Sequence, residues 1–506
     1  MPGTTMDVEA LSQETLSILR KAQTAGMLVS TGVQGVDLSG LVSLVPVNVP
    51  ARNNTSAFPR TIAPEGSQTA LWRALLNIND QQSSAAVGMD YAGSMADFDE
   101  QDVFAPYRPL AKAGRVTLDA VAAARNYVDA LSVTELQVLN QLFIAQDMNI
   151  INSQAYALPA IGTVTLAASA TGGTIGAAAP VYVAVAPRSG ANYFEGNSGP
   201  AGAAVDVTTG SGTTNSVSAT WAAVRGAAAY DVYVGSASGS LWYYTTVTTG
   251  TVTITSVPTA AAAVPNLPLI SQLAPGIGAN AFTGAGGDGH PPTVDGSYSA
   301  NYYNGVVAST LGDYGASAVV TPGTGNPSGA TFIDNGGNAM LLSGGGIDVL
   351  DKVNDSLWAS VQLSPTAYMV NSLQGDEISR LILSSDSATT FLPPTDADAR
   401  TNLAGGGYIG RYINRAAAGV PVAIEVHPRV APGTIVARTD RVPFPGSNIG
   451  TVFEVRCQFD TMRFDYAANF NPGSQGGGPR YDFEIRSMET LVNRAPVAQA
   501  IVANVA

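Results

Sequence analysis

Residues 132–150 read Ser132-Val-Thr-Glu-Leu-Gln-Val-Leu-Asn-Gln-Leu-Phe-Ile-Ala-Gln-Asp-Met-Asn-Ile. Ser132 and Glu135 have the spacing of a capping box, in which each side chain satisfies a free backbone N–H at the start of a helix. Apolar residues then recur at helical spacing: Leu136, Leu139, Phe143 and Ile150. Residues 116–131 show the same spacing, so the sequence predicts either one long kinked helix or two abutting helices.

Towards the N-terminus the pattern changes twice. Residues 7–25 predict a helix that ends at Gly26. Residues 41–80 predict a long hairpin, with an alternating strand over 41–49, turn chemistry over 50–56 and a return arm over 57–62. Prolines mark both arms and keep them out of a sheet interior: Pro46, Pro50, Pro59 and Pro64. Because nothing local can cover this hairpin, it indicates an arm that contacts another chain.

Beyond the long helical stretch, residues 160–265 are almost free of charge. They hold five charged residues: Arg188, Glu195, Asp206, Arg225 and Asp231. Short segments alternate with period two and are separated by Gly and Ser: 181–185, 204–207, 217–221, 230–234, 241–244 and 252–254. This spacing predicts a β-sandwich of about 100 residues. Helices resume after it, so the sequence predicts an inserted domain.

The C-terminal half follows a Gly-, Pro- and Asn-rich stretch over 275–346. Helical and strand patterns then follow in turn. We predict helices over 346–358 and 375–383, and strands over 363–370, 422–426, 434–437, 453–456, 483–486 and 490–492. Helices followed by a series of strands indicate the α+β class.

The composition excludes several kinds of protein. The 506 residues carry a net charge of −14 and only 12% are charged, against about 25% in an ordinary soluble domain. This argues against a protein that coats nucleic acid with a basic stripe, though not against the acidic wall of a container for it. The single cysteine, Cys457, excludes a disulfide framework and a Cys-rich metal site, and we expect it to be a small buried hydrophobe.

The chain carries no apparent targeting signal or membrane span. The first residues lack the basic and apolar regions of a signal peptide. Residues 232–287 are uncharged, but their Gly, Ser, Thr and Pro content excludes a membrane-spanning helix. We therefore expect synthesis in the cytoplasm and no membrane partner.

Residues that could do chemistry are few. His290 and His427 are isolated, each precedes a proline, and they have no metal-ligand spacing, so structural roles are expected. The acidic run 97–102 is a candidate for Ca²⁺ but lacks the EF-hand glycine and glutamate, which favours a solvated acidic loop, and Asp396 and Asp398 are interpreted in the same way. One aromatic set suits either a sugar-binding stripe or, as we favour, a sandwich core: Trp221, Tyr230, Tyr233, Trp242 and Tyr243. We predict no catalytic residues and no cofactor.

Four C-terminal segments carry a family resemblance. They are 438–444 (RTDRVPF), 450–456 (GTVFEVR), 481–486 (YDFEIR) and 491–498 (LVNRAPVA). This series resembles the C-terminal strands of tailed-bacteriophage major capsid proteins with the Hong Kong-97 fold. Residues 357–370 are similar to the passage from helix to strand in the axial domain of that family.

The resemblance implies an architecture and a role. It divides the chain into an N-terminal arm (1–40), an extended loop over a neighbouring subunit (41–80), a peripheral domain with a spine helix (81–159), an inserted sandwich (160–265), a Gly/Pro-rich connection (266–339), an axial domain (340–480) and C-terminal strands with a tail (481–506). Many copies would form the hexamers and pentamers of an icosahedral shell around double-stranded DNA, without sequence-specific contact. The protein would then be a non-enzymatic component of the virion capsid, assembled in the host cytoplasm.

Residues 217–233 carry a second resemblance, to fibronectin type III and immunoglobulin-like modules. In those modules a Trp on one strand precedes a Gly-Ala turn and a Tyr-x-Val-Tyr strand. The resemblance implies that Trp221, Tyr230 and Tyr233 belong to the sandwich core. It also implies a knob on the outer surface of a shell, which would stabilise the particle or bind a glycan weakly.

The capsid resemblance implies partners and contacts as well. Residues 41–80 contain no lysine, and the chain has only Lys21, Lys112 and Lys352, so we expect a shell without lysine crosslinks from that loop. The arm is too short for a fused scaffolding domain, which implies a separate scaffolding protein beside a portal and a decoration protein. Candidate inter-subunit ion pairs involve Arg52, Arg60, Glu65 and Arg73; a solvated loop is the alternative.

Two other functions stay open at this point. The sandwich would suit an adhesin-like surface or tail protein that binds carbohydrate, although the sequence shows neither a secretion signal nor fibre repeats. A depolymerase is the enzymatic alternative, since glycosidase carboxylates need no motif. No acid pair in a recognisable context supports it.

Overall fold

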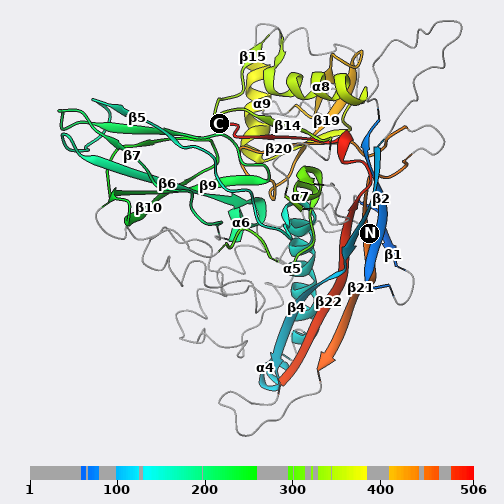
Figure 1. Cartoon of the computed structure of the whole chain (residues 1–506). Coiled ribbons are helices and arrows are strands. Elements are labelled where there is room, and N and C mark those ends of the chain that lie inside the picture. The colour runs from blue at the N-terminus through cyan, green and yellow to red at the C-terminus, as the bar shows by residue number, and fades with distance from the viewer. Residues whose placement is uncertain are drawn as a thin grey trace, which may run out of the picture.

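The computed structural model describes residues 58–63, 67–78, 99–124, 129–195, 198–258, 295–299, 301–313, 321–322, 329–343, 345–384, 409–443, 449–466 and 480–506. They form a mixed α+β structure in which strands predominate, as the sequence predicts. Figure 1 shows three parts: a long sheet with helix α5, a second sheet with helices above it, and a sandwich to one side. The predicted helix 7–25 and strand 41–49 lie outside the described residues.

The long sheet contains four strands in the order β1, β21, β22, β4. Their bounds are Arg60–Ile62, Phe453–Tyr466, Arg480–Asn493 and Arg108–Thr117. β22 is antiparallel to both β21 and β4, whereas β1 joins the edge of β21 in parallel. Alternation along β22 buries Phe483 and Ile485 and turns the residues between them to the other face of the sheet.

Helix α5 (Ala130–Asn152) packs along β4 and β22. Its apolar side joins the main core through Val138, Leu142, Ile150 and Ile151. The predicted capping box is wrong: the carboxylate of Asp129 caps the helix by accepting from the N–H of Leu131 at 3.0 Å. Residues 116–117 belong to β4, and a separate helix, α4, spans Leu118–Ala124. Of the two helical alternatives, two helices are therefore present.

A two-stranded hairpin lies beside the long sheet. It pairs β2 (Thr69–Asn77) with β3 (Asp99–Pro106) in antiparallel register. The prediction of a solvated acidic loop over 97–102 is wrong for residues 99–102, which are strand residues. Their carboxylates fit a strand because alternate side chains of β3 face solvent.

The second sheet has six strands in the order β14, β23, β20, β17, β19, β18. Their bounds are Thr331–Asp334, Ala500–Ala503, Ile435–Arg438, Ala367–Val370, Val420–Val426 and Arg411–Asn414. Helices α7 (Val306–Leu311), α8 (Asp348–Val361) and α9 (Ser372–Ser384) contact it. The strands at 422–426 and 434–437 and both C-terminal helices are confirmed, and the strand predicted at 363–370 is present over 367–370. The strands predicted at 483–486 and 490–492 are one continuous strand, β22.

Shorter elements complete the body. β12 (Gly312–Asp313) pairs with β13 (Thr321–Pro322), and β15 (Leu342–Ser343) pairs with β16 (Gly346–Ile347). A 3-10 turn, η1 (Pro496–Ala498), connects β22 to β23. The last residues of the chain therefore cross from the long sheet into the six-stranded sheet.

The region rich in Ser and Thr forms two sheets around a separate apolar core. One sheet has the order β10, β9, β6, β7, and the other β11, β8, β5. In chain order the strands are β5 (Thr165–Ser169), β6 (Pro180–Ser189), β7 (Val205–Thr208), β8 (Ser216–Thr220), β9 (Ala227–Ala237), β10 (Ser240–Val247) and β11 (Thr251–Ile254), with helix α6 (Gly190–Glu195) after β6. The six strands predicted here are confirmed; β5 is an addition.

Two facing sheets of four and three strands are an architecture that immunoglobulin-like modules also have. Here β5 and β6 lie in different sheets, and β5 pairs with β8. These pairings do not by themselves assign each strand to a strand of those modules, so the immunoglobulin-like relationship stays a prediction.

Candidate inter-subunit surface

The β2–β3 hairpin has one buried and one exposed face. Ala70, Trp72 and Ala74 alternate with exposed residues and pack with Val103 against Val492 of β22. On the opposite face, Leu71 and Phe104 are direct cross-strand partners. Their side chains stay 65% and 40% exposed. An exposed apolar pair on a supported hairpin is typical of a surface that another molecule covers.

Charged residues adjoin that apolar pair on the same face of the hairpin. The guanidinium of Arg73 lies 3.1 Å from Glu100 and 3.1 Å from Asp102. All three side chains belong to the hairpin, and Arg73 is exposed, so these pairs contribute little to stability. They place polar groups at one end of the apolar pair, and polar groups beside an apolar patch are usual at an interface.

The long sheet exposes a second apolar site on the face opposite α5. Met462 and Phe464 of β21 are 51% and 41% exposed. Beside them, Arg115 of β4 pairs with Asp482 of β22 at 2.8 Å. The hairpin packs on the same face at the other end of β22, through Val492. Both apolar sites therefore belong to the side of the long sheet that α5 does not cover.

The predicted inter-subunit residues fall in different places. Arg52 and Glu65 lie outside the described residues. Arg60, on β1, faces inward and pairs with Glu489 at 2.8 Å and Asp460 at 2.9 Å. Arg73 pairs within the hairpin, as described above. Both arginines have partners in their own chain. Their contribution to inter-subunit contacts stays a prediction.

Sequence reasoning missed Leu71, Phe104, Met462 and Phe464. For β2 a sequence signal exists, namely a period-two pattern of residues over Thr69–Asn77 that matches the observed alternation of buried and exposed side chains. The small Ala residues weaken the contrast of that pattern. No local signal distinguishes Met462 and Phe464. Their exposure depends on which face of the sheet α5 covers.

The proposed sandwich core is divided between two faces of β9. The rings of Trp221 and Tyr230 meet edge to face at 5.5 Å between the two sheets, and the Tyr230 hydroxyl accepts from the N–H of Val224 at 2.9 Å. Burial raises the pKa of Tyr230. Tyr233 is equally buried but lies in a separate cluster with Tyr243, because residues three apart on a strand point to opposite faces.

Tyr233 adjoins a buried ion pair. Nε of Arg188 lies 2.6 Å from Asp231, and the side chains are 1% and 0% exposed. Thr246 donates a further hydrogen bond to Asp231 at 2.5 Å. Burial of Trp221, Tyr230, Tyr233 and Tyr243 means that these rings do not form an exposed stripe for a sugar.

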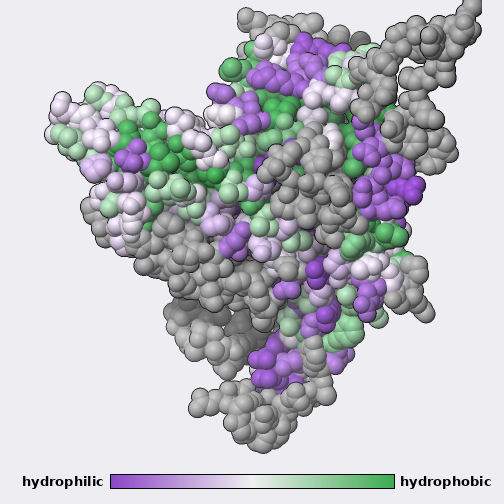
Figure 2. Space-filling view, in the orientation of Figure 1, coloured by the Kyte–Doolittle hydropathy of each residue, from purple (hydrophilic) through white to green (hydrophobic). Residues whose placement is uncertain are grey.

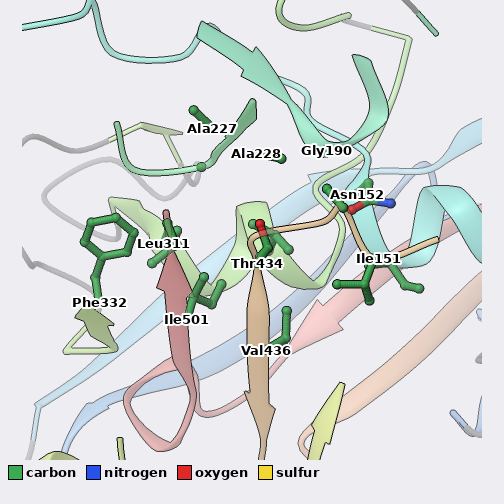
Figure 3. A pocket seen from close by; sticks show the side chains of 15 residues that line it. Ile151, Asn152, Gly190, Ala227, Ala228, Leu311, Phe332, Thr434, Val436 and Ile501 are labelled. Carbon is green, nitrogen blue, oxygen red and sulfur yellow. The ribbon is translucent and has the colours of Figure 1, made fainter. Parts of the chain in front are cut away.

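The sandwich contacts the six-stranded sheet through hydrogen bonds and a contact between a guanidinium and an aromatic ring. At the end of β14, Asp334 accepts from the N–H of Ala223 at 2.7 Å and from Nδ2 of Asn504 at 2.9 Å. The guanidinium of Arg225 lies 5.5 Å from the centre of the Phe332 ring. Between the two parts is a cavity whose lining is mostly apolar (Figure 3); it includes Ile151, Leu311, Phe332 and Ile501. Figure 2 shows hydrophobic residues gathered where the parts adjoin.

Chemistry-bearing residues do not converge in the part of the chain that the structure describes. There, no three His, Cys, Asp or Glu side chains are grouped as metal ligands would be. Nε2 of His427 lies 2.9 Å from Asp147, and both side chains are buried. Its Nδ1 accepts from the N–H of Arg429 at 3.1 Å. This pair joins α5 to the residue after β19.

Several other predictions have definite outcomes. Cys457 is buried, as predicted, and burial raises the pKa of its thiol to about 12. His290, Asp396 and Asp398 lie outside the described residues. Within the residues described, no helix is both long and apolar enough to span a membrane.

Comparisons with known proteins give matches among solved structures. No protein-family model matches the sequence, and no curated protein matches it. The chain is similar to a holo encapsulin from Synechococcus elongatus (9% identity, 95% of this chain and 94% of that chain, TM-score 0.36). It is also similar to the capsid of a native GTA particle (9%, 95% and 97%, TM-score 0.35) and to that of cyanophage Pam1 (7%, 87% and 85%, TM-score 0.36). Identities and TM-scores are low, so family membership is left as a proposal.

Proposed function

We propose that this protein is the structural subunit of an icosahedral phage head with the Hong Kong-97 fold. Copies would assemble into hexamers and pentamers and enclose double-stranded DNA. The sequence resemblance at 438–498 supports this role. So does the arrangement of a long helix on a long antiparallel sheet, joined to a second sheet with helices.

The observation that carries the proposal is the pair of apolar sites on one side of the molecule. Leu71 with Phe104, and Met462 with Phe464, are exposed on different elements of one face. Exposed apolar patches are typical of surfaces that another molecule covers, and two patches on different elements would allow contacts with neighbouring copies. Burial of these surfaces between copies would account both for the exposed apolar side chains and for the low share of charged residues in the chain, 12%.

The domain proposals follow from this role, with changes to the predicted bounds. The extended loop is proposed to include the β2–β3 hairpin as well as residues 41–80, since Thr69–Asn77 pairs with 99–106. The peripheral domain would hold α5 together with β4, β21 and β22, because these strands pair along most of their length. The axial domain would be built on the six-stranded sheet.

The proposed partners are other copies, a separate scaffolding protein, a portal and a decoration protein, with DNA enclosed without base readout. The shell is proposed to be non-enzymatic and non-covalent, without lysine crosslinks. Lys352, one of the lysines of the chain, pairs with Asp348 at 3.6 Å on the first turn of α8. The proposed location is the virion capsid, after assembly in the host cytoplasm.

Electron microscopy of the purified chain tests the role. The wild type is expected to form shells, or hexameric and pentameric capsomers, with scaffolding protein added where it is needed. Leu71→Asp together with Phe104→Asp is expected to give folded monomers, because two carboxylates would have to be desolvated at the contact. Thr253→Asp, at the exposed position of β11, is the matched control and should assemble normally. Monomers of wild type that cleave a glycan would overturn the proposal.

A carbohydrate-binding structural protein is the alternative function. It rests on the sandwich, whose resemblance to fibronectin-like modules is carried by Trp221 and Tyr230. Since both rings lie between the sheets, a glycan would have to bind elsewhere on the sandwich. A glycan array probed with the whole chain separates the two functions: saturable binding by monomers that never assemble would favour the alternative.

A further inference from the structure

The side of α5 that faces away from the main core carries a row of mostly apolar residues. We call this set the outer row; its members are Val133, Leu136, Asn140, Phe143 and Ile144. Leu136 is 58% exposed. The core residues Val138 and Leu142 each lie two positions from a member of the row, which is about 200° round the helix. The apolar members of the outer row belong to none of the four apolar cores.

The outer row also has no charged residue beside it. The charged residues of α5 are Glu135 and Asp147. Glu135 pairs with Arg463 of β21 at 2.6 Å, and Asp147 pairs with His427 at 2.9 Å, so both are turned towards their own chain. A surface helix normally presents charged residues to solvent, whereas a helix that is apolar on all sides is covered on all sides. α5 therefore has the composition of a helix that something covers.

The neighbouring elements lie on other sides of α5. β4 and β22 pack along the helix (Figure 1), and α6 and α7 begin beside residues 149–152 at its C-terminal end. Oδ1 of Asn140 is buried, yet it accepts no hydrogen bond from any residue that the structure describes. The outer row therefore leaves Leu136 exposed and Asn140 without a donor in that part of the chain.

Residues 7–25, which lie outside the described residues, have the sequence of an amphipathic helix. The sequence places one row on its apolar side: Val8, Leu11, Thr15, Ile18 and Leu19. Charged residues occupy the opposite side: Glu9, Arg20 and Lys21. A helix of this kind gains most of its stability when its apolar side packs against another element. Residues 7–25 therefore need an apolar partner.

The two rows have the same spacing and the same order of residue types. In each, Val and Leu come seven and four residues before a polar residue, and two large apolar residues come three and four residues after it. The polar residue is Thr15 in one row and Asn140 in the other. If the rows pack together, apolar side chains cover each other and the Thr15 hydroxyl, which is a donor, lies beside Oδ1 of Asn140.

We propose that residues 7–25 form a helix that packs on the outer row of α5 in the same chain, with Thr15 facing Asn140. Pairing between the α5 helices of two copies would also cover the outer row, but it would leave the apolar side of residues 7–25 uncovered. The chain connects the two helices, and such a tether favours docking within one copy. The inference concerns the single chain and does not rest on the proposed shell.

Docking would hold the N-terminal arm at two points. Phe58 is buried, and its ring stacks on that of Phe453 with 5.3 Å between the centroids. The chain is thus already anchored where the described residues begin. With residues 7–25 held on α5, residues 26–57 would form a loop that is tied at both ends. That loop, and not the amphipathic helix, would then be the part of the arm that is free to contact another copy.

Disulfide crosslinking in the full chain tests the position. Thr15→Cys combined with Asn140→Cys should crosslink under mild oxidation, because facing positions on packed helices bring two cysteines within disulfide reach. Ser17→Cys with Asn140→Cys is the matched control and should react far more slowly, since Ser17 lies on the opposite side of the predicted helix. Native Cys457 is buried and should not take part.

The crosslinked product should be a monomer, and its yield should not change on dilution. A product that joins two chains would overturn docking within one copy. Equal yields from the two cysteine pairs, or no crosslink from Thr15→Cys with Asn140→Cys, would overturn the proposed contact.

Hydrogen exchange measured by mass spectrometry tests the energetics. Residues 7–25 should be protected in the wild type. Leu136→Asp and Leu11→Asp should each lower that protection about tenfold or more, because a carboxylate would have to be desolvated at the contact. Gln141→Asp, at an exposed position of α5 away from the outer row, is the control and should leave it unchanged.

Leu11→Asp lies outside α5 and should leave the protection of peptides from the core side of α5 as in the wild type. This variant therefore separates release of the docked helix from general unfolding. Unprotected residues 7–25 in the wild type, or the same protection in Leu11→Asp and Gln141→Asp, would overturn the proposal.

Discussion

The indole N–H of Trp72 donates a 2.9 Å hydrogen bond to the backbone carbonyl of Asn493. The two residues are 421 positions apart in the chain, and the bond joins the β2–β3 hairpin to the end of β22. It is buried, so the carbonyl has no water to replace the indole. The position of the hairpin therefore depends on the last strand of the long sheet.

Trp72→Phe is expected to lower the free energy of unfolding by about 1–3 kcal/mol, because it leaves the buried carbonyl of Asn493 unpaired. Urea unfolding followed by circular dichroism measures this. Trp358→Phe is the matched control, since Trp358 is 42% exposed, and it should change stability by less than about 0.5 kcal/mol. Equal effects of the two substitutions would contradict the structural role of the hydrogen bond.

Ile501→Ala tests the C-terminal strand. β23 lies between β14 and β20, and Ile501 is 1% exposed. Truncation should cost about 2–5 kcal/mol, since it removes buried methyl groups and leaves a cavity. Ile413→Ala on edge strand β18 should cost far less, and the two midpoints of urea unfolding make the comparison. Similar midpoints would mean that β23 is not an interior strand in solution.

The buried pair of Arg188 and Asp231 predicts a strongly non-additive mutant cycle. Arg188→Met should destabilise the protein by about 3–5 kcal/mol, because it leaves an unpaired buried carboxylate. Adding Asp231→Leu should recover much of that loss by removing the remaining charge. Thermal unfolding of the two single variants and the double variant gives the coupling. Strict additivity would show that the two side chains do not interact.

The surroundings of Glu454 on β21 predict that the protein loses folding stability in acid. Burial opposes its ionisation, but hydrogen bonds from Thr61 and Arg494 outweigh burial and lower the pKa of Glu454 below its ordinary 4.5. A lowered pKa in the folded state gives stability that is present above the ordinary value and lost as pH falls through the folded value. Glu454→Gln should therefore flatten the fall in urea midpoint below pH 4.5. An unchanged slope would contradict this assignment.

For elements that bury one face, local patterns predicted the bounds to within a few residues. The helices at 346–358 and 375–383 and the sandwich strands are confirmed, because each carries its own period of apolar residues. The start of α5 was misplaced. Ser132 and Glu135 fit a capping box in sequence, yet Asp129 caps the helix, and Glu135 instead pairs with Arg463 at 2.6 Å.

The candidate surface was harder to predict than the fold. The sequence predicts Arg60 and Arg73 as charges on an extended arm, but both have partners within the chain, and Arg60 pairs with the buried Glu489. Nothing in the local sequence near Glu489 indicates that Arg60 lies beside it. The exposed pair Leu71 and Phe104 requires the register of a hairpin whose strands lie more than twenty residues apart.

The sequence by itself determined the α+β class, the charge-poor sandwich and the absence of a recognisable catalytic motif, since periodicity, composition and motifs are local properties of the chain. Tertiary structure alone decided which faces stay exposed and which charges are buried. Long-range pairing made those decisions: β1 joins β21, β22 joins β4, and β23 enters a sheet with β14 and β20. The physical reason is that exposure and charge pairing depend on the side chains packed against a residue, and here those come from segments hundreds of positions away.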